Sequence, residues 1–180
     1  MKLIKPIKIK KKSIYTLLLA IILLGIDVFL EQRDGVNKTV ENENLSEISE
    51  ENVKVERVID GDTIVLENGQ KVRYIGIDSP ETTSKDETIN CFAKLSLNKN
   101  KELVEGKTVK LEKDISETDK FDRLLRYVFV DGLFVNEYLV KEGYAKVSTF
   151  PPDVKYQEVF KNEEKTARED NKGLWGTICP

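Results

Sequence analysis

Alternating apolar and polar positions predict three consecutive strands between Val53 and Ile77. The first begins at Val53 and runs to Val58, the second is the β-branched stretch Thr63–Leu66, and the third alternates over Lys71–Ile77. The sequences Asp60-Gly61 and Glu67-Asn68-Gly69 are typical hairpin turns and separate the strands. This part of the chain is therefore predicted to form a β-meander.

Two further strands and a helix are predicted after the meander. The helix covers about Asn90–Leu103, although Asn98 and Asn100 weaken its propensity. The stretches Thr108–Leu111 and Leu124–Val130 are apolar and β-branched, which favours strands. The predicted strands now number five.

Two helices are predicted in the last third of the chain. Val135–Glu142 forms a short helix that Gly143 closes, and a final helix is capped by Asp153 and ends at Gly173. One face of this final helix carries apolar or aromatic residues, namely Tyr156, Val159, Phe160 and Ala167. Consecutive hairpins followed by helices predict an α+β fold, a small closed β-barrel with three α-helices packed on it.

The first 30 residues have the pattern of a targeting segment. Six lysines within residues 2–12 precede an apolar run over 14–26, which resembles the basic and hydrophobic regions of a signal peptide. A buried core helix is the alternative. Because no small-x-small cleavage pattern follows Gly25, an uncleaved signal-anchor that contacts the membrane through residues 14–30 is also open. The positive charge predicts that the rest of the chain is secreted or anchored on the outer face of the cytoplasmic membrane.

The acidic stretch 31–52 shows no convincing periodicity and is predicted to be a flexible linker or a propeptide. The folded domain is predicted to cover residues 53–180.

Composition limits the chemistry that this domain can perform. The 180 residues include 29 Lys and Arg, 32 Asp and Glu, two Cys and no His. The absence of histidine excludes Ser-His-Asp and Cys-His nucleophile systems, and it leaves too few ligands for a common zinc site. Any metal site is expected to use oxygen ligands and to bind calcium, magnesium or manganese. The mildly acidic body means that an anionic substrate must be bound by local arginines.

Three acidic clusters carry candidate chemistry. Asp60-Gly61-Asp62-Thr63 can be a simple turn, Asp78-Ser79-Pro80-Glu81 can start a helix, and Asp119–Arg123 can be a solvated loop with local ion pairs. Taken together they indicate more, because a meander can bring Asp62 and Asp78 close enough to share a Ca²⁺ ion.

Two arginines and a further carboxylate complete this constellation. Arg73 lies on the strand that leads to Asp78, and Arg123 begins the fifth predicted strand. Two guanidinium groups beside a hard cation suit a phosphodiester, and Glu81 is positioned to orient a water molecule. A metal, arginines and a carboxylate base are sufficient for phosphodiester hydrolysis without histidine.

The same segments resemble the motifs of a known family. Val58–Thr63 (VIDGDT), Val72–Glu81 (VRYIGIDSPE), Thr118–Tyr127 (TDKFDRLLRY), Val135–Val147 (VNEYLVKEGYAKV) and Gly173–Gly176 (GLWG) resemble the staphylococcal nuclease (thermonuclease) family in order and spacing. The resemblance implies a five-stranded OB-fold barrel with three helices, which agrees with the pattern of elements. It also implies a Ca²⁺-dependent endonuclease that cleaves DNA and RNA at the 5′ P–O bond and leaves 3′-phosphates.

The resemblance also implies a role for each matching residue. Asp62, Asp78 and the backbone carbonyl of Ser79 are expected to bind calcium. Glu81 is expected to act as the general base, and Arg73 and Arg123 to bind the phosphate and stabilise its developing charge. Asp60 is expected to support these ligands without binding the metal itself.

Substrate contacts are expected from the third cluster and from nearby aromatic residues. Lys120 is a candidate phosphate contact, with an ordinary surface lysine as the alternative. Phe121 replaces a family tyrosine, and Thr149 and Phe150 replace a second tyrosine-bearing stretch. Phe121, Phe150 and Tyr144 are candidate base-stacking surfaces, and a core role is the alternative for each.

The two cysteines, Cys91 and Cys179, can form only one intramolecular disulfide. Relatives of this family with cysteines at corresponding places are familiar, and an extracytoplasmic location favours the bond. In the chain-entropy account, closing so long a loop stabilises by about 4–5 kcal/mol. Two unrelated thiols are the alternative.

Three other functions compete with the nuclease hypothesis. The barrel could bind nucleic acid without cutting it, act as a calcium-dependent phosphodiesterase on a small or lipid substrate, or be a structural protein of the cell surface. The last leaves the carboxylates and arginines unexplained. We expect the nuclease to act as a monomer.

Overall fold

The computed structural model describes residues 51–180, and its first element is β1 (Glu51–Val58). The predicted signal peptide or anchor over 1–30, and the predicted linker as far as residue 50, lie outside the described residues. Residues 51 and 52, which the sequence pattern assigned to the linker, already pair with β5 (Thr108–Glu112).

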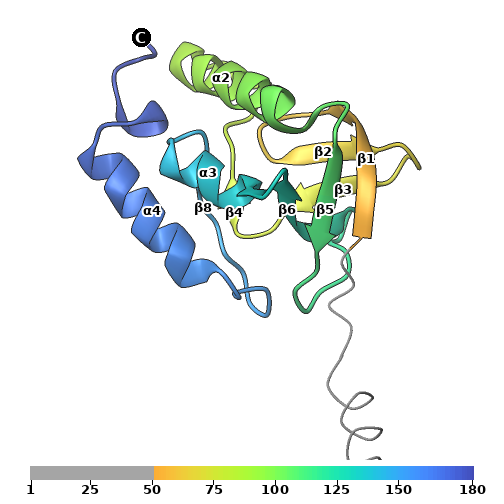
Figure 1. The fold of residues 1–180 in the computed structure, drawn as a ribbon. Coiled ribbons are helices and arrows are strands. Elements are labelled where there is room, and N and C mark those ends of the chain that lie inside the picture. The colour runs from red at the N-terminus through yellow and green to blue at the C-terminus, as the bar shows by residue number, and fades with distance from the viewer. Residues whose placement is uncertain (1–50) are drawn as a thin grey trace, which may run out of the picture. The chain divides into compact units, whose positions relative to one another are not determined.

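Five strands close into a barrel (Figure 1). β1, β2 (Thr63–Leu66), β3 (Lys71–Tyr74), β5 and β6 (Leu124–Val130) run in the order β3-β2-β1-β5-β6, and a parallel pairing of β3 with β6 closes the ring. β1 pairs with β5 through its first half and with β2 through its second half, and its register shifts between Val55 and Arg57. Such a shift bends a strand. The predicted five-stranded barrel is confirmed.

Three α-helices pack on this barrel or on one another beside it, as predicted. α2 (Glu87–Val104) contacts β1, and α3 (Val135–Lys141) contacts both β6 and α4 (Gln157–Glu169). In Figure 1, α3 lies between α4 and the barrel. One continuous core joins the barrel to the helices, and its fully buried members include Ile64, Leu66, Val109, Leu139 and Phe160. None of the helices within residues 51–180 is long and apolar enough to cross a membrane.

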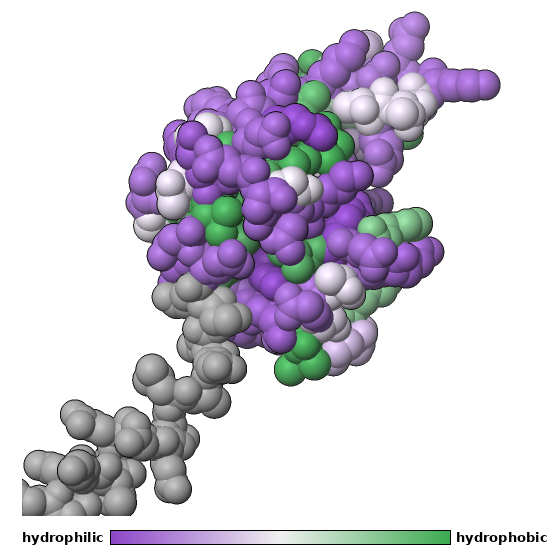
Figure 2. Space-filling model, turned by 90° about the vertical axis from the view of Figure 1, so that its right-hand side faces the viewer, coloured by the Kyte–Doolittle hydropathy of each residue, from purple (hydrophilic) through white to green (hydrophobic). Residues whose placement is uncertain are grey.

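One face of the domain is predominantly polar. Figure 2 shows a face that is mostly hydrophilic, with hydrophobic residues in small scattered groups. The charged side chains therefore lie mainly outside the core.

The third predicted strand is interrupted in the structure. Instead of one strand over Lys71–Ile77, β3 ends at Tyr74, and β4 (Ile77–Asp78) pairs with β8 (Lys146–Val147) outside the barrel. Gly76 makes the break, with φ of 81°, and a Cβ there would lie 2.5 Å from the Phe160 ring. Only glycine fits this positive φ and this close contact with Phe160. Gly76 therefore allows the chain to turn out of the barrel at this point.

α2 begins three residues earlier than predicted. Asp86 caps it by accepting a hydrogen bond from the backbone N–H of Ile89, which is the usual role of an aspartate at this position. Asn100, predicted to weaken the helix, is completely buried and bonded on both ends of its amide. Tertiary hydrogen bonds here outweigh a low helical propensity.

The predicted boundaries of the last helix are wrong at both ends. Asp153 does not cap it, because its carboxylate accepts the backbone N–H groups of Ile115 and Ser116 instead. The helix ends at Glu169, where Asn171 turns the chain with φ of 54°, and Gly173 belongs to the short 3₁₀ turn η1 (Gly173–Trp175). Val159, placed on the apolar face by the pattern, is 39% exposed.

A short strand follows β6, and a disulfide holds the end of the chain. β7 (Leu133–Phe134) extends β6 by a tight turn at Asp131 and Gly132, which both have positive φ. A disulfide joins Cys91 in α2 to Cys179 near the C-terminus, 88 residues apart in sequence. The C-terminal segment is thereby held against the helix that covers the barrel.

Candidate active site

Asp62 is held in place at the entrance to β2. It is only 3% exposed, and its Oδ2 accepts the backbone N–H of Ser79 at 2.6 Å. Its own N–H donates to Asp60 Oδ1 at 3.0 Å, which gives Asp60 the supporting position expected from the sequence. Burial raises the pKa of Asp60, while Thr63 and the nearby arginines oppose this shift. Asp62 is thus fixed at its backbone by the turn and at its carboxylate by Ser79, which follows β4.

Arg73, on β3, links the two carboxylates predicted to bind metal. One guanidinium nitrogen forms an ion pair with Asp62 Oδ1, and the other lies 2.9 Å from Asp78 Oδ1. Burial lowers the pKa of Arg73; Asp78 opposes this shift and Arg123 adds to it. The structure therefore brings Asp62, Arg73 and Asp78 together, as the sequence predicted, and places Arg123 close enough to influence the group.

Lys146 is a site neighbour that the sequence interpretation missed. It lies opposite Asp78 in the β4–β8 pairing, and its Nζ is 3.2 Å from Asp78 Oδ2. Nothing in the local sequence around Lys146 indicates this contact, because the pairing joins segments 68 residues apart. The Asp78 carboxylate therefore forms ion pairs with two side chains, those of Arg73 and Lys146.

Arg123 is positioned by a local turn before β6. The Asp119 carboxylate accepts the backbone N–H groups of Phe121 and Arg123 and, at 2.7 Å, the Nε of Arg123. Burial raises the pKa of Asp119, but these hydrogen bonds outweigh it, so that the pKa lies below its ordinary value. The sequence interpretation offered local ion pairs in this loop as one alternative, but it did not assign Asp119 the role of positioning Arg123. Its four-residue spacing to Arg123 was the available signal.

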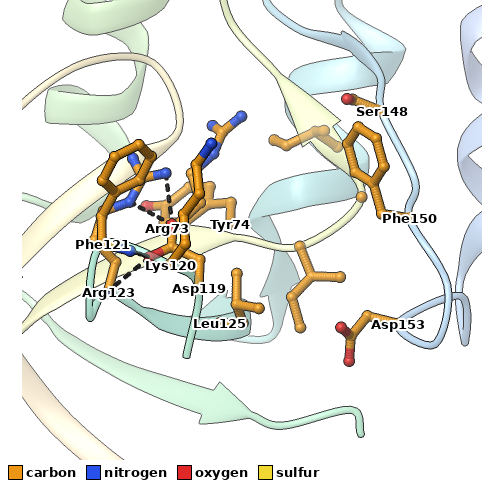
Figure 3. A pocket seen from close by; sticks show the side chains of 13 residues that line it. Arg73, Tyr74, Asp119, Lys120, Phe121, Arg123, Leu125, Ser148, Phe150 and Asp153 are labelled. Carbon is orange, nitrogen blue, oxygen red and sulfur yellow. Dashed lines mark hydrogen bonds and ion pairs between the residues drawn. The ribbon is translucent and has the colours of Figure 1, made fainter. Parts of the chain in front are cut away.

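A cavity of about 520 Å³ opens beside these groups (Figure 3). Arg73, Arg123, Lys120 and Phe121 line one side, and Ser148, Phe150 and Asp153 line the other. Apolar side chains form the remaining wall, among them Ile75, Ile77 and Leu125. The cavity thus combines cationic groups with an apolar surface, which suits a phosphate attached to a flat organic ring.

Two of the three candidate stacking residues lie at this cavity. Phe121 is 66% exposed, with Lys120 Nζ 5.0 Å and Arg123 Cζ 5.6 Å from the ring centroid. Phe150 is 73% exposed on the opposite side. Tyr144, in contrast, is half-buried against the core and lines a different, smaller cavity, so its predicted stacking role has no support in this geometry. Thr149 bonds to Gln157 Oε1 at 3.0 Å.

Glu81 does not line the cavity. It is exposed in the segment between β4 and α2, and within residues 51–180 its side chain makes no hydrogen bond or ion pair. The geometry thus leaves the predicted general base outside the group formed by Asp62, Arg73 and Asp78.

Comparison with known sequences decides the family. The sequence model of the staphylococcal nuclease homologue family matches residues 71–177, which is more than half of the chain. The chain belongs to this family. The match includes Arg73, Asp78, Glu81 and Arg123, while Asp62 precedes it.

Individual relatives in the staphylococcal nuclease family are similar over most of this chain. It is 42% identical to endonuclease YncB of Bacillus subtilis over 129 residues, covering 69% of this chain and 61% of YncB. It is 36% identical to the thermonuclease of Staphylococcus hyicus over 159 residues, covering 87% of this chain and 91% of the relative. The thermonuclease of Staphylococcus intermedius is 32% identical over 169 residues, covering 92% of this chain and 98% of the relative.

The carboxylates fit a hard cation only with help from backbone and water. The part of the chain that the structure describes contains no group of three or more Asp, Glu, Cys or His side chains that could hold a metal. Asp62 and Asp78 nevertheless reach one common guanidinium, so both can face a single cation. Calcium and magnesium accept carboxylates, backbone carbonyls and water, so this donor set suits either ion.

Proposed function

We propose that this chain is a Ca²⁺-dependent nuclease that hydrolyses phosphodiester bonds in DNA and RNA. One observation carries the proposal. Arg73 and Arg123 open onto the same cavity, and Arg73 is bound to the two aspartates that are expected to hold the metal. The names of the relatives, endonuclease and thermonuclease, support the same activity.

Substrate binding would use charge on one part of the cavity and an apolar surface on the other. The two guanidinium groups can each donate paired hydrogen bonds to a phosphate. The exposed Phe121 ring can stack on any base, since every base has a π-face. Contacts of this kind are tolerant of sequence, and Lys120 adds a further positive charge near the phosphate.

Hydrolysis would follow from these same groups. Asp62, Asp78 and the Ser79 carbonyl would hold the Ca²⁺, which supplies positive charge to stabilise the transition state. For this step the exposed segment between β4 and α2 would have to bring Glu81 to the phosphate. Glu81 would then take a proton from the attacking water, whose oxygen bonds to phosphorus as the bond to the 5′ oxygen breaks. The departing 5′ oxygen takes a proton from solvent, and a 3′-phosphate remains. Arg73 and Arg123 neutralise the charge on the phosphate oxygens.

The test is degradation of heat-denatured DNA and of RNA by the purified chain at slightly alkaline pH, first with Ca²⁺ and then with a chelator. We expect degradation only with Ca²⁺, and a loss of at least about a hundredfold in Glu81→Gln, which also controls for contaminating nucleases. The 3′ ends should block polymerase extension until a phosphatase is added. Extension without phosphatase would contradict the proposed products.

Binding of nucleic acid without cleavage is the second candidate, because the exposed Glu81 side chain makes no hydrogen bond or ion pair to the group formed by Asp62, Arg73 and Asp78. Binding alone needs no general base, so the segment that carries Glu81 would not have to move toward the phosphate. A folded chain that binds single-stranded DNA and leaves it intact in Ca²⁺ would establish this candidate and refute the nuclease.

We further propose that the enzyme acts outside the cytoplasm, as a monomer. The basic and apolar residues of 2–26 and the Cys91–Cys179 disulfide support this location. Residues 1–30 would serve as signal or anchor, and residues 31–50 as a linker. Cell fractionation with a cytoplasmic marker tests the location, and size-exclusion chromatography tests the oligomeric state. Recovery with the marker would refute the first proposal, and a dimer the second.

A further inference from the structure

Asn100 of α2 lies behind the active site without lining the cavity. It is completely buried, and its amide is bonded at both ends. Its Nδ2 donates to the backbone carbonyl of Asp60 at 3.0 Å, and its Oδ1 accepts the hydroxyl of Tyr74 at 2.9 Å. Tyr74 is itself only 1% exposed. The bond to Tyr74 is buried and the bond to Asp60 is partly buried, which increases the penalty for losing them.

Both partners of Asn100 are next to residues of the proposed site. Asp60 is in the turn that carries Asp62 and receives the Asp62 N–H. Tyr74 follows Arg73 directly, and its backbone N–H donates to the Asp62 carbonyl at 2.9 Å. One amide thus connects the segment that supplies a metal ligand with the strand that supplies the arginine.

The contact between α2 and this turn is unusually close. A Cβ on Gly61 would lie 2.6 Å from the Cβ of Ser96 and 2.6 Å from the Cβ of Ser79. Ser96 precedes Asn100 by four residues, so both occupy the same face of α2. The helix face therefore packs against the turn between Asp60 and Asp62, and a shift of the helix would move Asp62.

We propose that Asn100 is a positioning residue that sets the distance between Asp62 and Arg73 and thereby the affinity of the metal site. An apolar residue would suit a buried helix position better, since asparagine favours helices poorly and must be fully hydrogen-bonded when buried. Both hydrogen bonds of the amide go toward the site and none to another part of α2. The proposal rests on the proposed function, because it concerns the same metal site.

The experiment is a calorimetric titration of Ca²⁺ into the substrate-free chain, well below the melting temperature of every variant. We expect Asn100→Ala to weaken Ca²⁺ binding by about tenfold or more, as the loss of groups that orient metal ligands usually does. Tyr74→Phe removes one of the two bonds and should weaken binding less. If Asn100→Ala fails to fold, Tyr74→Phe carries the test, and weakening by more than about twofold is then the expected result.

Leu139→Ala is the matched control for general loss of stability. Leu139 is fully buried in α3, and its side chain is apolar. This variant should lower the melting temperature and change Ca²⁺ affinity by no more than about twofold. Affinities of Asn100→Ala and Tyr74→Phe within that same range would overturn the proposal and leave the proposed nuclease intact. Failure of the unmodified chain to bind Ca²⁺ or to cleave DNA would instead refute the proposed function and, with it, this inference.

Discussion

The two arginines of the cavity are held in contrasting ways. Arg73 projects from a barrel strand, and its two carboxylate partners come from separate segments, at the start of β2 and the end of β4. Arg123 follows a tight turn, and its partner Asp119 lies four residues earlier in the chain. One half of the site therefore depends on the tertiary fold, while the other is a local structure attached to it. Loss of either arginine should reduce activity, but only loss of Arg73 should also reduce the stability of the fold.

Arg73→Ala should have the largest effect, because it changes both activity and stability. Loss of a charge-stabilising donor should reduce kcat/KM by about 10²–10³-fold. Asp62, which is 3% exposed, would lose its cation, and breaking such a buried pair costs about 3–5 kcal/mol. Assays on denatured DNA and urea unfolding measure the two effects.

Arg73→Lys serves as the control for the Arg73 prediction. It retains a positive charge for Asp62 and should recover much of the stability, but not the paired hydrogen bonds to phosphate. An Arg73→Ala variant as stable as the unmodified chain would show that Asp62 does not depend on this ion pair.

Arg123→Ala should reduce kcat/KM by a similar factor of about 10²–10³ while leaving stability almost unchanged. The ion pair with Asp119 is partly exposed, with side-chain exposures of 27% and 17%, and such local pairs contribute about 1 kcal/mol or less. The same two measurements apply. A destabilisation equal to that of Arg73→Ala would remove the proposed contrast between the halves.

Phe121→Ala should weaken binding of single-stranded DNA by about 1–3 kcal/mol, seen mainly as a higher KM, with little change in stability. The ring is 66% exposed, so its loss leaves no cavity in the core. Ile178→Ala is a matched control, because Ile178 is 67% exposed and does not line this cavity. Equal KM values for the two variants would argue against stacking on Phe121.

Asp119→Asn should have the smallest effect, a change in the acid dependence of stability. The pKa of Asp119 lies below its ordinary value of 3.8, so this carboxylate stabilises the fold above pH 3.8 and loses that effect as pH falls through the lowered pKa. The variant should be slightly less stable at neutral pH and should match the unmodified chain in strong acid. Melting curves across this range provide the measurement. A difference that persists at the lowest pH would show that charge is not the cause.

Local patterns were sufficient wherever neighbouring residues define the structure. The strands around Ile64 and Val128 follow from short apolar, β-branched stretches, and the helix at Val135 from its apolar pattern and the glycine that closes it. The candidate site was recognised for a similar reason, since its carboxylates and arginines lie in short motifs.

The errors occurred where contacts between distant segments outweigh local preference. The third strand breaks at Gly76, where the contact with Phe160 leaves no room for a side chain, and Asp153 bonds to the loop at Ile115 and Ser116 instead of capping a helix. Lys146 reaches Asp78 through a pairing that no local pattern contains.

The sequence by itself determined the five barrel strands and three α-helices, the family motifs and the residue types available for chemistry. Periodicity, turn residues and the absence of histidine are properties of the chain, independent of how it folds. Only the tertiary structure decided that Arg73 would bridge Asp62 and Asp78, that Asn100 would connect their supporting segments, and that Glu81 would lie outside the cavity. The physical reason is that ion pairs and buried hydrogen bonds require positions within a few ångströms, and closure of the barrel sets those positions.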